Sequence, residues 1–302
     1  MNSFKTVFRG LAAAALLFAG SASADSLIGV NPFNNTPAQP GLLIMNPDTG
    51  AVIGGHVVVV PGRTINAVQG IATDPTTGIS YAIARAVAVA GRLLIRISPS
   101  NGHGAEIGNL GDNFSSIAFR NDGQLFGVTG DGATVPETLF LINKDTAATT
   151  LATALGNGAD GEVIAYHPPS NSFFHWSGGG VIFFERIDAN APYTVTNVPI
   201  TGSTTGEVFG AVWNPAIGQF QVHNISSVMD FWTPTGVRSN TQAATTFDVR
   251  GMILFAAPLA LASQVPTLGE WAMLLLALLM AGVAMRALSG RGAPNSPSAR
   301  RS

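Results

Sequence analysis

The strongest constraint on the fold of this chain is an internal repeat. An apolar strand pattern that ends in a turn recurs through the middle of the sequence. Measured between their last residues, the final three intervals of this pattern are 45 residues each. A repeat of this length is typical of folds built from stacked units of supersecondary structure. The five copies occupy residues 42–46, 94–98, 140–143, 185–188 and 231–233.

A second strand pattern recurs in step with the first. It starts at Ile71, Ile117, Ile164 and Ala211, at intervals of 46, 47 and 47 residues. A turn and another apolar segment follow, and less regular segments complete four strands per unit. One four-stranded sheet cannot bury both of its faces alone, whereas sheets arranged around a central axis bury them against one another. The intervals therefore predict an all-β fold, a five-bladed β-propeller with four-stranded blades.

The two ends of the repeat predict how the ring closes. Residues 27–30 look like the second strand of a unit, so the first unit lacks its innermost strand. A fifth copy of the second pattern, at 252–256, has no unit of its own and would complete that first sheet. The predicted propeller therefore spans residues 25–257. A β-sandwich is the main alternative fold, although it gives no reason for such regular intervals.

Two segments carry a resemblance to known proteins. They are Ile44-Met45-Asn46-Pro47-Asp48-Thr49-Gly50 and Gly70-Ile71-Ala72-Thr73-Asp74-Pro75. The first resembles the turns, and the second the inner strands, of a broad class of bacterial extracytoplasmic propellers. Turn geometry sets these motifs, so the resemblance implies a fold and no particular chemistry.

Residues 1–24 have the layout of a secretory signal peptide. Lys5 and Arg9 precede an apolar core at 11–20, and no arginine pair precedes that core, which indicates the general secretory route. Ala22 and Ala24 supply the small residues that signal peptidase requires, so cleavage is predicted before Asp25. An uncleaved anchor is the alternative, but the core is too short to cross ~30 Å of hydrocarbon.

An apolar segment at 271–288 follows a short linker at 258–264 and predicts a transmembrane helix. Its length corresponds to about 27 Å of helix, at the low end of a membrane span. Arginines at its end and beyond it place the C-terminus in the cytoplasm and the body in the periplasm. These basic residues are Arg286, Arg291, Arg300 and Arg301.

A recognisable motif stands directly before this helix. With the apolar segment and the basic end, it resembles the IPTL-CTERM sorting signal of Gram-negative bacteria, which here covers 265–302. The resemblance implies recognition by an exosortase-like membrane enzyme and delivery to the cell surface. A plain, unprocessed anchor is the alternative. The motif residues are Val265, where Ile is commoner, Pro266, Thr267, Leu268, Gly269, where Ser is commoner, Glu270 and Trp271.

The composition of the body excludes several classes of function. Residues 25–264 contain nine basic and sixteen acidic residues, so the body is acidic and lacks the basic surface that binds nucleic acid. The chain contains no cysteine. Disulfides, cysteine nucleophiles and cysteine-ligated metals are therefore excluded, and a hydrophobic core must stabilise the exported body.

Acidic residues recur just before the predicted inner strands. In a propeller, the loops that lead into these strands converge around one mouth of the central channel. Carboxylates gathered there would suit a hard cation such as Ca²⁺, or a polyol. Ordinary solvated turn residues would give the same pattern. The residues of this predicted mouth are Asn66, Asp112, Asp160, Glu162, Glu207 and Asp248.

One position of the inner strands is aromatic, and we predict that its side chains pack between blades. Enzyme motifs are sparse: Gly178-Gly179-Gly180 lies between two strands and is predicted to be a turn, and no nucleophile elbow occurs. His167 and His175 lie on consecutive strands and could approach each other, although His167 occupies a turn position. The aromatic residues are Phe119, Tyr166, Trp213 and Phe255.

These observations favour binding over catalysis. The leading prediction is an exported, surface-sorted, non-enzymatic propeller that binds a partner, a polysaccharide or a matrix component. A hydrolase or lyase is the alternative, because lactonase-type propellers, which this body would resemble, hold a metal at the channel mouth with acidic residues and Asn. A purely structural matrix protein is a third possibility. No cofactor is predicted apart from the Ca²⁺ ion that the acidic mouth would suit.

Overall fold

A computed structural model describes residues 26–155, 162–179, 181–202, 206–239 and 248–255. Contacts divide the chain into the units Met1–Ala257 and Pro258–Ser302, and all described residues belong to the first. The predicted signal peptide, transmembrane helix and sorting motif lie outside the described residues. Nowhere in the described ranges is there a helix with the length and hydrophobicity to cross a membrane.

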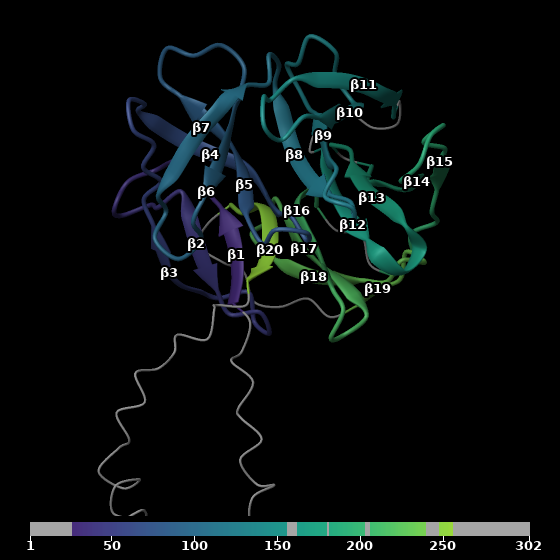
Figure 1. The fold of residues 1–302 in the computed structure, drawn as a ribbon. Coiled ribbons are helices and arrows are strands. Elements are labelled where there is room, and N and C mark those ends of the chain that lie inside the picture. Colours follow the sequence, from purple (N-terminus) through teal and green to yellow (C-terminus); the bar gives the residue numbers. More distant parts are fainter. Residues whose placement is uncertain (1–25, 156–161, 180, 203–205, 240–247, 256–302) are drawn as a thin grey trace, which may run out of the picture. The chain divides into compact units, whose positions relative to one another are not determined.

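The described body consists of five antiparallel sheets of four strands each, arranged around a centre as blades (Figure 1). In each of blades 2 to 5 the strands follow one another from the centre outward in chain order. Blade 2 contains β4 (Ile65–Thr73), β5 (Ser80–Ala86), β6 (Leu93–Ile97) and β7 (Gly104–Asn109), and blade 3 contains β8 (Phe114–Phe119), β9 (Leu125–Thr129), β10 (Thr138–Ile142) and β11 (Thr149–Ala154). Blade 4 contains β12 (Val163–His167), β13 (Ser172–Ser177), β14 (Phe183–Asp188) and β15 (Val195–Asn197), and blade 5 contains β16 (Val208–Asn214), β17 (Gln219–Asn224), β18 (Met229–Trp232) and β19 (Arg238–Ser239).

Blade 1 is built from both ends of the body. Its strands, from the centre outward, are β20 (Arg250–Phe255), β1 (Ser26–Val30), β2 (Leu42–Met45) and β3 (Val52–His56). β20 pairs antiparallel with β1, with Ile28 opposite Ile253. The five inner strands β20, β4, β8, β12 and β16 contact one another in a closed circle. The five-bladed fold and the closure predicted from residues 27–30 and 252–256 are therefore confirmed, within the described residues.

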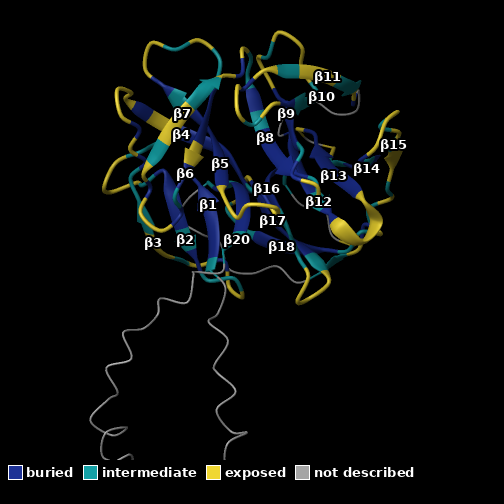
Figure 2. Ribbon diagram, viewed as in Figure 1, coloured by how far each residue is buried: buried dark blue, intermediate teal, exposed yellow. Residues whose placement is uncertain are grey.

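Hydrophobic clusters lie between neighbouring blades and hold the ring together. Blades 1 and 2 share one cluster around Ile28 and Ile71, and the remaining four junctions each have their own cluster. The inner and middle strands are accordingly buried, while outer strands such as β7 and β11 are largely intermediate or exposed (Figure 2). Burial between sheets, rather than within one sheet, thus stabilises the fold.

The predicted aromatic position requires a correction of one residue in blade 1. Phe119, Tyr166 and Trp213 each pack against the preceding blade, as predicted. Phe255 instead packs toward blade 2, and Leu254 takes the position equivalent to the other three. Because side chains on a strand alternate between faces, a slip of one residue transfers a side chain to the opposite face.

β-Bulges mark the start of the inner strands in four of the five blades. Gln69, Ser115 and Phe209 are each skipped in the pairing of their strands with the next strand of the blade. In β20 the skipped residue is Gly251, which follows Arg250. A bulge inserts one residue and redirects the side chains near it. Here the bulges direct side chains toward the central channel.

Gly251 also marks a close approach between the inner strands of blades 1 and 2. Its φ is +63°, and a Cβ atom placed there would lie 2.8 Å from the Cα atom of Gly70 in the neighbouring inner strand. Gly218, in a turn of blade 5, has a similar φ of +65°, but nothing lies within 4 Å of its Cβ position. An alanine at Gly218 would therefore add backbone strain alone, whereas an alanine at Gly251 would add both backbone strain and a steric conflict.

We predict that Gly251→Ala destabilises the propeller more than Gly218→Ala. Each change should cost roughly 1–2 kcal/mol for the left-handed backbone. Gly251→Ala should cost roughly 1–3 kcal/mol more, because the backbone of blade 2 must move away. Urea unfolding of the two variants and the wild-type protein measures both effects. Equal losses in the two variants would show that the blades do not approach each other at Gly251.

Candidate functional site

A polar cavity of about 370 Å³ lies at the mouth of the channel where the inner strands begin. Its walls come from the starts of the five inner strands and from two loops between second and third strands, β5–β6 and β9–β10. This volume falls within the range of small-molecule sites, about 300–1,000 Å³. The lining residues are Gln69, Arg92, Asn113, Ser115, Gly130, Asp131, Glu162, Glu207, Phe209 and Arg250.

Five of these residues form a ring with one member from each blade, which we call the mouth ring. Its members, from blade 1 to blade 5, are Arg250, Gln69, Ser115, Glu162 and Phe209. In blades 2 to 5 each member stands two residues before the start of the repeated inner-strand pattern. In blades 1, 2, 3 and 5 a bulge at or next to this position turns the side chain into the cavity. One structural position repeated five times therefore presents five different chemical groups.

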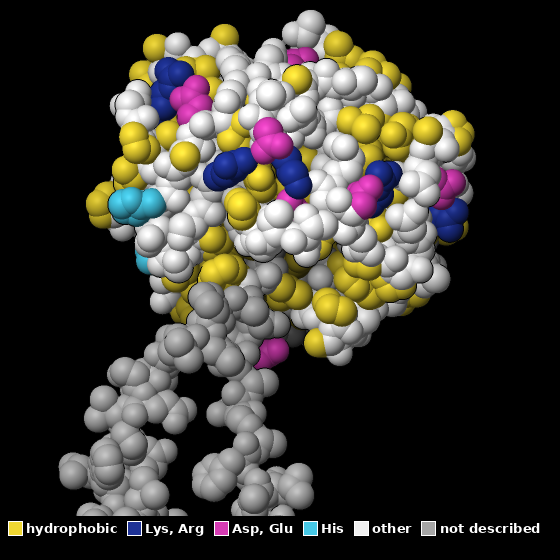
Figure 3. Space-filling view, in the orientation of Figure 1, with side chains coloured by type: hydrophobic (Ala, Val, Ile, Leu, Met, Phe, Trp, Pro, Cys, Tyr) yellow, Lys and Arg dark blue, Asp and Glu magenta, His cyan; other side chains and the backbone are white. Residues whose placement is uncertain are grey.

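Charge at the mouth is divided between the two sides of the ring. Arg92 and Arg250 come from blades 2 and 1, whereas Asp131, Glu162 and Glu207 come from blades 3, 4 and 5. Figure 3 shows that the drawn face is mostly uncharged and that basic and acidic side chains adjoin near its middle. The cavity therefore offers a basic side and an acidic side to a bound molecule.

The basic side is held in place by neighbouring groups. The Arg92 carbonyl accepts a hydrogen bond of 2.8 Å from Leu110 N, and the Asn109 side chain donates to the Ala90 carbonyl at 2.8 Å, which fixes the β5–β6 loop. The Arg250 guanidinium carbon lies 3.8 Å from the centre of the Phe209 ring, a cation–π contact that joins blades 1 and 5.

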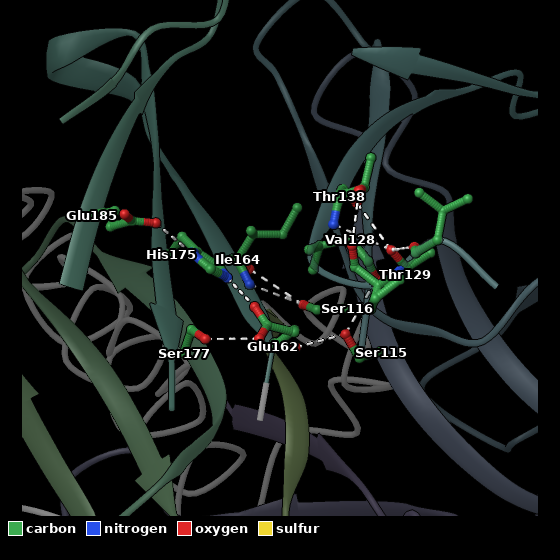
Figure 4. A network of polar contacts seen from close by, with 12 residues as sticks. Ser115, Ser116, Val128, Thr129, Thr138, Glu162, Ile164, His175, Ser177 and Glu185 are labelled. Atoms are coloured by element: carbon green, nitrogen blue, oxygen red, sulfur yellow. Dashed lines mark hydrogen bonds and ion pairs between the residues drawn. The ribbon is translucent and has the colours of Figure 1, made fainter. Parts of the chain in front are cut away.

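On the acidic side, Glu162 belongs to a buried polar network (Figure 4). Its carboxylate contacts Nε2 of His175 and accepts a hydrogen bond of 2.7 Å from the Ser177 hydroxyl. Nδ1 of His175 lies 3.1 Å from the carboxylate of Glu185. Burial by itself would lower the pKa of His175, but hydrogen bonds with both carboxylates raise that pKa to about 9. The imidazolium therefore balances the carboxylate that faces the cavity.

Serine hydroxyls connect this network to blade 3. The Ser115 hydroxyl donates to the Glu162 carbonyl at 2.7 Å, and Ile164 N donates to the Ser116 hydroxyl at 3.2 Å (Figure 4). These bonds fix the start of β12 against the start of β8. The position of Glu162 in the mouth is thus set by blade 3 and by its own blade.

The six residues predicted at the mouth do not all line the cavity. Glu162 and Glu207 line the cavity, as expected. Asp112 accepts hydrogen bonds from Thr134 N at 2.8 Å and Val135 N at 3.2 Å; burial opposes its charged form, but these bonds lower its pKa. It therefore orders the β9–β10 loop and is not among the lining residues.

The remaining three lie beside the cavity or outside the described part. Asn66 is exposed on β4 and is not among the lining residues. Asp248 lies next to Arg250, with 3.6 Å between a carboxylate oxygen and Nε. Burial raises the pKa of Asp248, although Arg250 opposes this effect. Asp160 is outside the described residues.

A metal at this mouth stays a prediction. Within the described ranges, no group of three His, Asp or Glu side chains is placed to hold a metal ion. Glu162 is already bound by His175 and Ser177, and two arginines line the same cavity. The described residues at the mouth therefore do not fit a calcium ion, which prefers a shell of oxygen ligands.

Sequence reasoning missed most of the mouth ring. A signal was present, because Gln69, Ser115, Glu162 and Phe209 all stand at the same offset from the repeated inner-strand pattern. The sequence also allows His167 and His175 to approach each other. The strand register separates them, because His167 pairs with Ser172, whereas His175 pairs with Ile164. They lie at opposite ends of β12 and β13. His167 instead contacts the Trp213 ring, with 4.2 Å between ring centres.

The opposite mouth of the channel is less polar. A second cavity of about 370 Å³ is lined there by the ends of the five inner strands and by Pro75, Pro168 and Pro215. Ser26 pairs with Phe255, so both ends of the described body lie at this mouth. The polar mouth is therefore the end of the propeller where groups able to recognise a polar ligand converge.

Comparisons with known proteins concern the tail and the fold separately. The IPTL-CTERM motif matches residues 264–291, which confirms the sorting signal predicted from Pro266, Thr267 and Trp271. The motif implies an exported, surface-directed protein that an exosortase-type sorting enzyme recognises. No curated protein matches the chain.

Several solved structures are similar in fold. TolB from Acinetobacter baumannii shares 16% identity over 80% of this chain and 58% of its own, with a TM-score of 0.47. A structural-genomics protein of unknown function from Bacteroides thetaiotaomicron VPI-5482 shares 14% identity over 72% and 49%, with a TM-score of 0.43. Kuenenia stuttgartiensis hydrazine synthase shares 12% identity over 72% and 60%, with a TM-score of 0.40. The chain thus spans 49–60% of the length of these structures, and nothing about its function follows from them.

Two buried histidines predict a bell-shaped dependence of stability on pH. His175 has its pKa raised to about 9, so its stabilisation is complete below pH 6.5 and is lost as the pH rises toward 9. Burial lowers the pKa of His223 to about 4, so stability is lost as the pH falls from 6.5 toward 4. Each limb should have a slope of ~1.4 kcal/mol per pH unit.

Urea unfolding between pH 4.5 and 9 tests this prediction. The free energy of unfolding should be greatest near pH 6.5. His175→Gln should remove the alkaline limb and also lower stability at pH 6.5, because two buried carboxylates lose their counter-charge. His223→Gln should remove the acid limb. A wild-type profile that stays flat from pH 6.5 to 9 would contradict the assignment of a protonated His175.

Proposed function

We propose that this protein is an exported, non-enzymatic propeller that binds a carbohydrate of the cell surface or its matrix in the polar channel mouth. The observation that carries the proposal is the mouth ring, which brings an amide, a hydroxyl, a carboxylate and a guanidinium together around one cavity. Such groups donate and accept the hydrogen bonds that sugar hydroxyls require. The fold provides the positions, and the side chains at those positions provide recognition.

The chemistry of the ring supports binding over turnover. Glu162 contacts His175 and accepts a hydrogen bond from Ser177, so its carboxylate is held in one orientation. Gln69 is buried, lines the cavity and has no hydrogen-bond partner among the described residues. An amide that is open to the cavity can donate and accept hydrogen bonds with a ligand or water. Gln69 is thus a group available to a ligand.

The tail supports the proposed location. We propose that signal peptidase releases the mature protein before Asp25 and that the segment at 271–288 holds it in the inner membrane with a periplasmic body. The exosortase-type enzyme would then process the chain near Pro266 and Thr267, and the body would reach the cell surface. A carbohydrate-binding body is suited to that location, because surface polysaccharides are present there at high local concentration.

We predict that Gln69→Leu weakens glycan binding about tenfold, because it keeps the volume of the side chain and removes one buried hydrogen-bonding group. Gln219→Leu is the matched control, because Gln219 lies on blade 5 at the end away from the polar mouth. This variant should bind as wild type. A glycan array followed by calorimetry on the exported protein measures both. Hydrolysis or elimination of a bound compound that stops after chelation would contradict the proposal and support the metal-dependent lactonase-like alternative.

We also predict that replacing Pro266 and Thr267 with Ala leaves membrane insertion intact and blocks release. Proline keeps the segment before the apolar helix extended, which is the conformation that a membrane peptidase binds. Fractionation of cells and the intact mass of the protein in each fraction provide the measurement. A double variant that reaches the same fraction at the same mass as wild type would show that the tail is a plain anchor.

A further inference from the structure

We propose that the ligand of the polar mouth carries a carboxylate, as an acidic sugar does, and that the arginines of blades 1 and 2 bind this carboxylate. This inference rests on the proposed function and specifies its class of ligand. It depends on three guanidinium groups, those of Arg85, Arg92 and Arg250, which we call the arginine cluster. Arg92 and Arg250 line the cavity, whereas Arg85, on β5, is not among the lining residues and acts on Arg92 through its charge.

The charges of the arginine cluster act on one another. Burial lowers the pKa of Arg92, and the positive charges of Arg85 and Arg250 lower it further. Like charges are held this close only at a cost in free energy. An anion bound between the arginines offsets their mutual repulsion. This side of the mouth therefore favours a negatively charged group.

Protein carboxylates do not neutralise the cluster. Within the described residues, neither Arg85 nor Arg92 forms an ion pair. Arg250 has one acidic neighbour, Asp248, at 3.6 Å from its Nε atom, and this contact is not a hydrogen bond. By contrast, exposed arginines elsewhere on the body, such as Arg63 and Arg96, pair directly with Glu106 and Asp145.

The cluster also has donors that are unused. The Nε atoms of Arg85, Arg92 and Arg250 are buried and have no hydrogen-bond partner in the described part of the chain. A guanidinium group presents its N–H donors in a planar fork that matches the two oxygens of a carboxylate. Both the charge and the geometry of the cluster therefore point to this group.

The acidic side of the mouth identifies the rest of the ligand. Asn113 has a buried side-chain oxygen without a hydrogen-bond partner, and Asp131 and Glu207 line the cavity near it. These oxygens accept hydrogen bonds, as sugar hydroxyls donate them. They would also repel a second negative charge, which favours a singly charged carboxylate over a phosphate monoester. A molecule with one carboxylate and several hydroxyls matches both sides.

Calorimetry on the full-length exported protein tests the inference. The probes are trimers of one uronate (galacturonate, mannuronate or glucuronate) and two neutral sugars, the methyl ester of each, and a galactose trimer with a single sulfate. We expect at least one uronate trimer to bind at least tenfold more tightly than its methyl ester, which has the same skeleton without the charge. The difference should decrease as salt is added.

Arginine variants locate the charge. Arg92→Gln should weaken binding of the uronate trimer at least tenfold and leave binding of the methyl ester unchanged. Arg96→Gln, on the same blade but exposed and paired with Asp145, is the matched control and should bind as wild type. Thermal unfolding of both variants checks that the propeller is intact, and Arg92→Lys provides a second variant if Arg92→Gln unfolds.

Each of the other possible binding results would contradict one particular part of the proposal. If the ester binds as tightly as the uronate, or the sulfated trimer binds more tightly than both, the carboxylate is not what the mouth selects, and the proposed carbohydrate-binding function stands. If Arg92→Gln binds the uronate as wild type, the arginine cluster is not the site. If neither the uronates nor the glycans of the array bind, the proposed function itself fails.

Discussion

The pairing of β20 with β1 is the contact on which the rest of this structure depends. Each blade buries its faces against two neighbours, so an open ring would leave two apolar sheet faces in water. Pairing Ile28 with Ile253 joins the beginning of the body to its end and removes both exposed faces. The central channel, its two mouths and the convergence of five inner strands exist only because this one antiparallel pair forms.

Most of the fold could be predicted from the sequence because its physical causes are periodic. Blades of equal size produce equal intervals, and the position of Ile71 in blade 2 is repeated by Ile117 and Ile164 in blades 3 and 4. The position of Phe255 was predicted one residue out of step, because Met252, and not Ile253, packs toward the preceding blade as Ile71 does. Both residues are apolar, so the pattern of the strand does not distinguish the two alignments.

The candidate site was less predictable because its groups are brought together by tertiary contacts. Glu162 and Glu207 line the cavity at the mouth, since the loops before the inner strands converge in any propeller. The prediction did not foresee that backbone N–H groups of the β9–β10 loop bind Asp112, nor that Arg92 comes from a different kind of loop. Both features depend on which groups hydrogen-bond to each other in the folded chain. The spacing of residues in the sequence does not reveal those partners.

The place of β20 in the chain has a consequence for how the protein is made. A chain that crosses a membrane with its N-terminus first delivers β1 early and β20 last, after every other described strand. Throughout that passage the first blade lacks its central strand, and the arc of blades stays open. An interrupted chain keeps two strand edges that can pair with other chains. For such a chain, the ring can close only after nearly all residues before the sorting motif have crossed the membrane. A closed ring would therefore indicate that the body has been fully exported.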